Sequence, residues 1–205
     1  MTADYSLVTA FDAYARTAPE RPGVVAAIDA LSGALRTSPR PVAGQCDWSE
    51  SFAGLLQSHA DDKTAAGRFA AAIGAVADEL TWLIPYLEHG EPDLIHLHRH
   101  YRYAAIAGPY PSARFHCDRA ALFVSIQGAD VDYTQHVHKA PELYGVLGGS
   151  GGWQLGDGPH ETRTSGEWIW HPTGARHAMR TTDEAMTAMA IWTDDLESLP
   201  VIVRQ

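Results

Sequence analysis

The stretch QHVHKAPELYGVLGG, residues 135–149, brings together side chains that can bind a metal ion or move a proton. Residues two apart in a β-strand project from the same face, so His136 and His138 project together. For the same reason, Glu142 and Tyr144 share a face of the next segment. The intervening KAP sequence favours a turn. A hairpin here would therefore gather two imidazoles, a carboxylate and a phenol.

Imidazole and carboxylate ligands together suit Zn, Fe, Mn, Ni or Co, and three protein ligands leave coordination positions for water or substrate. A further imidazole has to come from a distant strand. His177 is the candidate, because it comes just after a Pro-x-Gly turn in GEWIWHPTGARHAMRTT. The sequence therefore predicts a catalytic metal site that joins the hairpin to His177. The alternative is a solvent-facing set of polar residues on an amphipathic hairpin.

The second half of the chain has a residue pattern typical of short β-strands. After residue 92, short segments rich in β-branched and aromatic residues alternate with Gly, Pro, Asp and Ser. This spacing predicts a mainly β fold, either a sandwich or a small barrel of the jelly-roll kind. We expect HLHRH, residues 96–100, to form a strand and GGSGG, residues 148–152, to form a hairpin turn. His171, directly before Pro172, is expected in a turn.

The first half of the chain has helical spacing instead. Apolar residues recur at three- and four-residue intervals, and Asp47 is the expected cap of the third helix. Helices are expected over residues 5–17, 23–36, 51–60 and 63–87. We therefore predict an N-terminal helical extension, residues 1–91, packed against a barrel of residues 92–205 in one compact unit.

Composition narrows the function classes. The chain has 205 residues with 15 basic and 25 acidic side chains, a formal net charge of −10, which argues against a nucleic-acid or anionic-membrane partner. Cys46 and Cys117 lie far apart and suggest no disulfide framework or thiolate metal site; both are expected as small buried residues. The N-terminus lacks the basic and apolar regions of a signal peptide, and no run approaches a membrane span. We expect a cytoplasmic protein, with a homodimer as an option.

Two motifs in the right order give a family resemblance. The segment from His136 to Gly149 resembles the first cupin motif: H-x-H, three residues, E, six residues, G. The second motif, G, five residues, P-x-G, two residues, H, is matched by Gly166, Pro172, Gly174 and His177. The resemblance implies a cupin-type jelly-roll β-barrel. It also implies one divalent transition metal, with ligands drawn from His136, His138, Glu142 and His177.

Further residues resemble one cupin group in particular, the dimethylsulfoniopropionate lyases of the DddQ and DddL type. The matching features are a tyrosine three residues before the first histidine, a tyrosine two residues after the glutamate, the ending WHPTGARHAMRT and the strand YAAIAGP. Val137 stands where many relatives have arginine. The resemblance implies β-elimination of a small sulfonium zwitterion to dimethyl sulfide and acrylate.

The resemblance also implies roles for individual residues. Tyr144 would be the general base, and Tyr133 would orient the carboxylate or assist proton transfer. His136 would be either a ligand or a substrate contact. Trp192 and Trp170 are our choices for aromatic contacts to the substrate cation. Other candidate walls of the pocket are Trp48, Tyr101, Tyr103 and Trp168.

Other readings stay open at this level. Tyr144 and Tyr133 could be packing residues of strands. The same metal site could serve a cupin dioxygenase acting on a thiol or small acid, or an isomerase. A third reading is a non-catalytic binder or sensor of a small molecule.

Overall fold

The computed structural model describes residues 3–41, 49–61, 63–87 and 94–204. The helices are α1 (Ala3–Ala15), α2 (Val24–Ala34), α3 (Glu50–Ser58), α4 (Ala65–Gly74), the 3-10 helix η1 (Ala77–Glu79) and α5 (Ile95–His100). The strands are β1 (Trp82–Leu83), β2 (Tyr101–Gly108), β3 (Phe115–His116), β4 (Ala121–Gln127), β5 (Asp132–Val137), β6 (Glu142–Leu155), β7 (Glu161–Thr164), β8 (Trp168–His171), β9 (His177–Arg180), β10 (Met186–Trp192) and β11 (Val201–Ile202).

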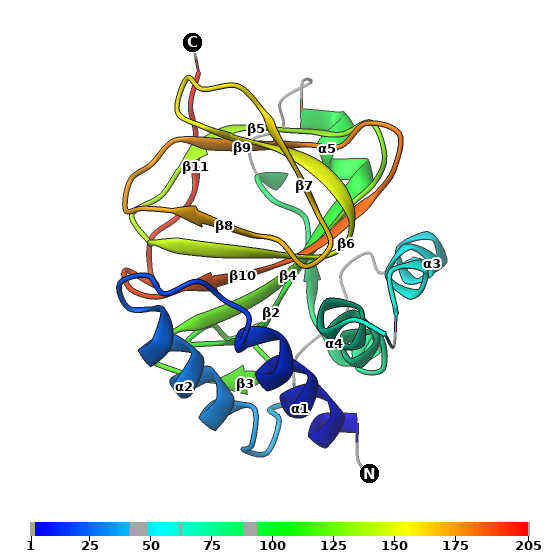
Figure 1. Cartoon of the computed structure of the whole chain (residues 1–205), viewed down its shortest axis with the longest axis vertical. Helices are drawn as coiled ribbons and strands as arrows, with labels where there is room; N and C mark the ends of the chain where they lie inside the picture. Colours follow the sequence, from blue (N-terminus) through cyan, green and yellow to red (C-terminus); the bar gives the residue numbers. More distant parts are fainter. Residues whose placement is uncertain (1–2, 42–48, 62, 88–93, 205) are drawn as a thin grey trace.

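The strands curl into a barrel (Figure 1). Their order is β1-β2-β4-β10-β6-β9-β5-β11, with β3 on β2 and with β7 and β8 on β6. Strand β6 is long enough to belong to both sides of the barrel. Its first half pairs with β10 and β8, and its second half pairs with β9 and β7. The mainly β, jelly-roll barrel predicted from the sequence is confirmed.

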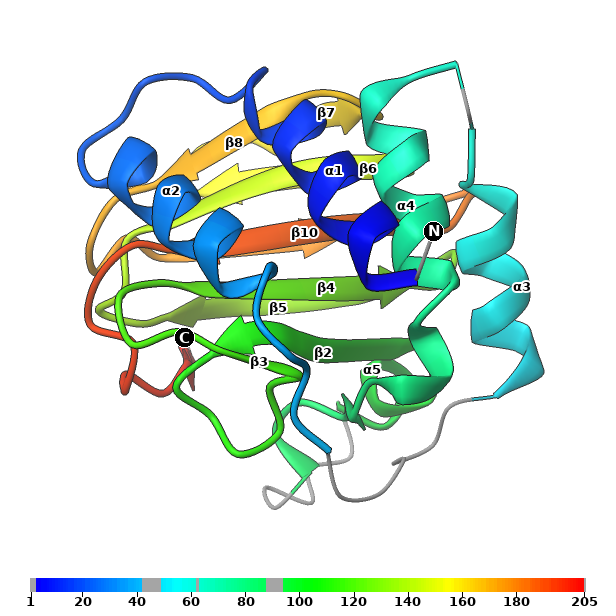
Figure 2. The ribbon, with the colours of Figure 1, turned by 90° about the horizontal axis from the view of Figure 1, so that it is seen from below.

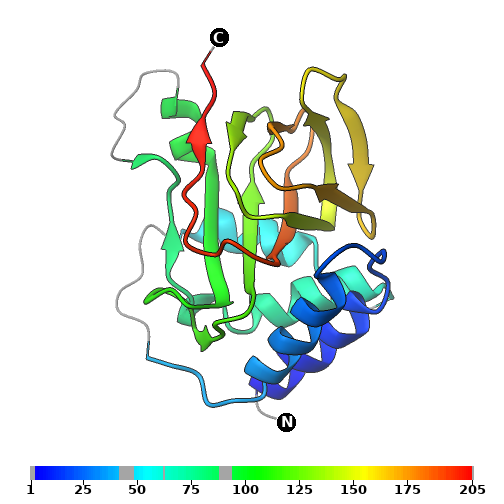
Figure 3. The same ribbon diagram turned by 90° about the vertical axis from the view of Figure 1, so that its left-hand side faces the viewer.

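Helices cover one outer face of this barrel (Figure 2). The buried side chains Phe11, Phe69, Leu122, Leu143 and Ile191 belong to one apolar cluster that joins the helices to β4, β6 and β10. Burying such surface is the main favourable contribution to folding. The N-terminal helical extension therefore packs against the barrel, as predicted, and Figure 3 shows the two layers from the side.

Glycines on β6 permit the close approach of the helical layer. A Cβ at Gly145 would lie 2.7 Å from the Tyr14 hydroxyl, and one at Gly148 would lie 2.3 Å from the Cβ of His59. The prediction that residues 148–152 form a turn was wrong. The glycines lie inside β6. The space that a larger residue would need is occupied by His59 of the helical layer at Gly148, by Met186 at Gly151 and by His160 and Arg180 at Gly152.

Two helix and strand assignments were also wrong. Residues 63–87 do not form one helix: α4 ends at Gly74, and Trp82 pairs with Ala104 of β2 in the sheet. Trp82 is fully buried there, and its indole donates to the Ala77 carbonyl. Residues 96–100 belong to helix α5, which begins at Ile95, and do not form a strand. In both places tertiary packing overrides the local pattern.

Several sequence expectations fall outside the described residues: the cap at Asp47, the wall residue Trp48, the burial of Cys46 and the boundary at residues 91–92. Cys117 is buried, as expected. Within the described part of the chain, no helix is long and apolar enough to cross a membrane.

Candidate metal centre

Three strands bring the predicted ligands together at one end of the barrel. His136 lies near the end of β5 and pairs in register with His177, the first residue of β9. His138 follows the end of β5, and Glu142 is the first residue of β6. All four side chains are buried, with exposed fractions of 1–6%. The solvent-facing alternative is therefore excluded for these residues.

The Glu142 carboxylate lies at the centre of the group. Its Oε2 atom is 3.2 Å from Nε2 of His138 and 3.3 Å from Nε2 of His177. Its other oxygen, Oε1, accepts a hydrogen bond of 2.7 Å from the Trp192 indole. One oxygen is therefore held by a neutral donor, while the other is shared among imidazoles.

Each of the three predicted histidine ligands has its Nδ1 atom next to a backbone carbonyl. The Nδ1···O distances are 3.1 Å from His136 to Thr134, 3.0 Å from His138 to Ala140 and 2.9 Å from His177 to Ala175. Such a contact fixes the proton on Nδ1, which leaves the Nε2 lone pair for a metal ion. Fixing the unused ring nitrogen in this way is typical of metal-ligating histidines.

The electrostatics of the group follow from its burial. Burial lowers the pKa of His136 well below its usual range, and the nearby His177 lowers it further. Burial would raise the pKa of Glu142, but the surrounding imidazoles, with His138 first, hold it well below its usual range. The site therefore favours an anionic carboxylate and a neutral His136, as metal ligation requires. Burial would lower the pKa of His138, but its contact with Glu142 raises that pKa above the usual value, so a metal ion at its Nε2 atom would have to replace a proton.

The donor set fits a divalent transition metal. The nitrogen atoms of His136, His138 and His177 lie within 4.8 Å of one another. Zinc bonds of about 2.0–2.1 Å in a tetrahedron put neighbouring ligand atoms ~3.3 Å apart. The distances from Glu142 to His138 and His177 match that spacing, and Nε2 of His177 has no hydrogen-bond partner among the described residues. This His/Glu cluster could therefore hold a metal ion.

Sequence reasoning missed His171, which was assigned to a turn. It is the last residue of β8, is 1% exposed and pairs in register with Glu142. Its Nδ1 atom is 3.7 Å from Glu142 Oε2, and its ring centroid is 4.0 Å from that of His177. Together with Glu142 and His177 it forms a second possible ligand group. His171 lies two residues after Ile169, so it projects from the same, inner face of β8, and this spacing could have indicated an inward position. The proline that follows His171 favoured a turn instead.

The two predicted proton-transfer residues lie inside the same barrel. Tyr144 is one inward position along β6 from Glu142; burial, and then the Glu142 charge, raises its pKa well above the usual value. The Tyr133 hydroxyl donates to that of Tyr86 at 3.2 Å, and its ring is 4.5 Å from the His136 ring. Tyr101 stacks on Tyr133 at 4.9 Å. The tyrosines therefore line the interior next to the ligand group.

The two tryptophans predicted to contact substrate lie in different places. Trp192 stacks on His138 at 4.7 Å and bonds Glu142, so it belongs to the ligand group. Trp170 pairs in register with Leu143 and packs against the cluster beneath the helices. It therefore lies on the opposite face from Glu142, because alternate residues of β8 face opposite sides. The prediction of a substrate contact at Trp170 is not supported by this placement.

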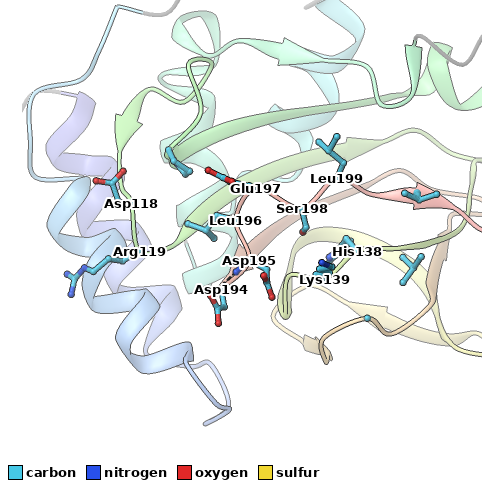
Figure 4. Close-up of a pocket in the computed structure, with 14 residues that line it drawn as sticks. Asp118, Arg119, His138, Lys139, Asp194, Asp195, Leu196, Glu197, Ser198 and Leu199 are labelled. Atoms are coloured by element: carbon cyan, nitrogen blue, oxygen red, sulfur yellow. Dashed lines mark hydrogen bonds between the residues drawn. The ribbon is translucent and has the colours of Figure 1, made fainter.

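A surface pocket of about 1110 Å³ reaches the ligand group at His138. The segment between β10 and β11 lines much of it, and Figure 4 shows Asp194, Asp195 and Ser198 of that segment beside His138 and Lys139. The Ser198 hydroxyl accepts a hydrogen bond from the backbone N–H of Ala140 at 3.2 Å. This contact ties the segment to the turn that carries the ligands.

Comparison with known proteins agrees with this geometry. A family model for dimethylsulfoniopropionate lyase matches residues 26–188. Dimethylsulfoniopropionate lyase DddQ of Ruegeria pomeroyi is 34% identical over 95 residues, which are 46% of this chain and 45% of that protein. The aligned stretch therefore spans slightly less than half of the relative.

Solved structures match over nearly the whole chain. The crystal structure of the DMSP lyase DddQ from Ruegeria pomeroyi DSS-3 has a TM-score of 0.74 at 26% identity, covering 98% of this chain and 96% of that chain. A chain from the crystal structures of the DMSP lyases RdDddP and RnDddQII has a TM-score of 0.73 at 23% identity, covering 98% of both chains. The second match bears on the fold alone.

Proposed function

Because this chain belongs to the dimethylsulfoniopropionate lyase family, we propose that it cleaves dimethylsulfoniopropionate by β-elimination to dimethyl sulfide and acrylate. The observation that carries the proposal is the buried group of His136, His138, Glu142 and His177 with Tyr144 on the same inner face. The group combines a metal-binding donor set with a phenol.

His138, Glu142 and His177 are the ligands best supported by their mutual distances, with His136 as the fourth. The metal is Zn, Fe, Mn, Ni or Co, the ions that imidazole and carboxylate ligands suit. When bound, it supplies positive charge that lowers the pKa of a neighbouring phenol and stabilises negative charge on the substrate carboxylate.

Tyr144 is the proposed general base. In its ionised, phenolate form, its oxygen takes the proton from the carbon next to the carboxylate and becomes a neutral phenol, and the C–H electron pair forms the new carbon–carbon double bond. The carbon–sulfur bond breaks at the same time, and its electron pair leaves with sulfur as neutral dimethyl sulfide. The leaving group therefore needs no acid. Burial and the Glu142 charge both raise the pKa of Tyr144, so a cation in the ligand group has to offset them.

Tyr133 and Trp192 support this step in different ways. Tyr133, held by its bond to Tyr86 and placed against His136, is proposed to orient the substrate or assist proton transfer. Trp192 holds one oxygen of Glu142, so its main contribution is to position a ligand. Its ring and those of the interior tyrosines also offer faces to the sulfonium cation.

The deciding experiment is headspace gas chromatography over purified protein loaded separately with Zn, Fe, Mn, Ni or Co. We expect dimethyl sulfide in the headspace, and an equal amount of acrylate in solution by liquid chromatography, with at least one metal. Neither product with any of the five metals would overturn the proposal. Oxygen consumption with Fe(II) would instead indicate the dioxygenase reading.

We also propose a homodimer, supported by the exposed edge strand β11, where Val201 is 60% exposed. Light scattering coupled to size exclusion tests this, and the 22.2 kDa mass of one chain would contradict it.

A further inference from the structure

Two polar side chains in the barrel interior have no hydrogen-bond partner among the described residues. They are Trp153, at its indole Nε1 atom, and His171, at both ring nitrogens. The Nδ1 atom of His171 lies 3.7 Å from Glu142 Oε2, which is beyond hydrogen-bond distance. Trp153 is 3% exposed and His171 is 1% exposed. An indole N–H can only donate, and a neutral imidazole carries one N–H as well. Because buried donors are nearly always paired, this pair calls for an acceptor.

The two side chains lie next to the proposed base. The ring centroid of Tyr144 is 4.7 Å from that of Trp153 and 5.6 Å from that of His171, while Trp153 and His171 are 6.2 Å apart. All three belong to inward positions, since Trp153 packs in the interior cluster with Tyr144 and His171 pairs with Glu142. Both donors therefore lie next to the residue that would take the substrate proton, and they also lie close to each other.

We propose that Trp153 and His171 form a carboxylate-binding pair that holds a short aliphatic carboxylate beside Tyr144. A carboxylate has two oxygens that accept several hydrogen bonds, and bonds from N–H groups to a charged acceptor are about twice as strong as neutral ones. That the carboxylate is the substrate's own rests on the function proposed above.

The position gives the pair a role in the elimination. In the transition state the C–H bond is broken further than the C–S bond, so part of the negative charge on the adjacent carbon spreads onto the carboxylate oxygens. Fixed N–H donors at those oxygens stabilise that charge without reorganising. They also hold the carbon that loses its proton at a constant position relative to Tyr144.

The test is calorimetric titration of zinc-loaded protein with propionate, an unreactive carboxylate, and with propionamide, its neutral counterpart. We expect wild-type protein to bind propionate more tightly than propionamide. Trp153→Phe keeps the ring but removes the donor, so propionate binding should weaken by about tenfold or more while propionamide binding changes little. Unchanged propionate binding in this variant would overturn the proposal.

Trp168→Phe is the matched control. Its indole N–H donates to Thr17 and its ring stacks on Tyr14, both on the helical side of the barrel. Removing that N–H should leave propionate binding at the wild-type value. Equal weakening in both variants would overturn the assignment to Trp153.

Variants of His171 supply a second measurement. They test the proposal if circular dichroism shows that Trp153→Phe does not fold. His171→Leu should weaken propionate binding about tenfold while elemental analysis finds zinc retained, and His171→Gln, which keeps N–H donors, should recover part of the loss. Loss of zinc from His171→Leu would overturn the pairing, because His171 would then be a ligand.

The outcomes for this pair and for the lyase function separate cleanly. If the variants lose propionate binding but wild-type protein releases no dimethyl sulfide with any metal, the carboxylate pair stands and the proposed function fails. If wild-type protein cleaves dimethylsulfoniopropionate but Trp153→Phe binds propionate normally, the function stands and the pair fails.

Discussion

The two faces of strand β6 differ in the side chains that they carry and in what those side chains contact. Glu142 and Tyr144 face the barrel interior among histidines, whereas Leu143 and Gly145 face the helices, in the apolar cluster and against Tyr14. The inner residues are polar and buried, which lowers the stability of the fold unless their polar atoms form hydrogen bonds or bind a metal ion. The outer ones contribute packing. The comparison suggests that function and stability can be changed separately along the same strand.

The largest effect is expected from the inner face. Tyr144→Phe removes the proposed base and should lower turnover by about 10²- to 10⁴-fold. Elemental analysis should find the metal retained. The control is Tyr14→Phe, which removes a phenol hydroxyl on the outer side, where it donates to the Val146 carbonyl. Normal turnover in Tyr144→Phe would remove tyrosine from the mechanism.

Leu143→Ala tests the outer face, because Leu143 lies between Glu142 and Tyr144 in the sequence but points to the helical side. Leu143 is fully buried, so truncating it should lower the free energy of unfolding by about 2–5 kcal/mol. Metal content and turnover should stay near wild type at temperatures where the variant is folded. Denaturant unfolding measures the first effect. A loss of metal without a loss of stability would break the proposed separation of the faces.

Trp192→Phe changes a residue that contacts a proposed metal ligand but is not itself a ligand. It removes the hydrogen bond to Glu142 Oε1, and loss of such a supporting contact typically lowers metal affinity by about 10- to 100-fold. Competition with a chelator measures this. Trp170→Phe, on the outer face, is the matched control and should leave metal affinity unchanged; an equal loss in both would refute the role of the indole N–H.

The smallest effect concerns His59, a histidine of the outer side that bonds Thr187 at 2.8 Å. Burial lowers its pKa, so between its unfolded and folded pKa the unfolded chain binds more protons and stability falls as pH falls through about 6.5. The loss of unfolding free energy from pH 7.5 to 5.5 should therefore be slightly smaller in His59→Gln. An identical or larger loss in the variant would contradict this.

The candidate site was predictable where its residues are close in sequence. The spacing of His136, His138 and Glu142 fixes a hairpin with alternating faces, and the second motif supplied His177. His171 was missed because a proline follows it, and Trp170 was misplaced because periodicity does not say which face of a strand points inward. The helix predicted over 63–87 failed because burial of Trp82 in the sheet outweighs helical spacing.

The sequence by itself predicted the mainly β fold with helices ahead of it from local periodicity, and it predicted the proposed metal-binding residues from their spacing and from a family resemblance. Only the tertiary structure decided that Trp192 holds Glu142, that Trp153 and His171 lie next to Tyr144, and that the glycines of residues 148–152 lie within a strand. These relations depend on strand register and on which face of the sheet the helices cover. Both are set by the packing of segments far apart in the chain.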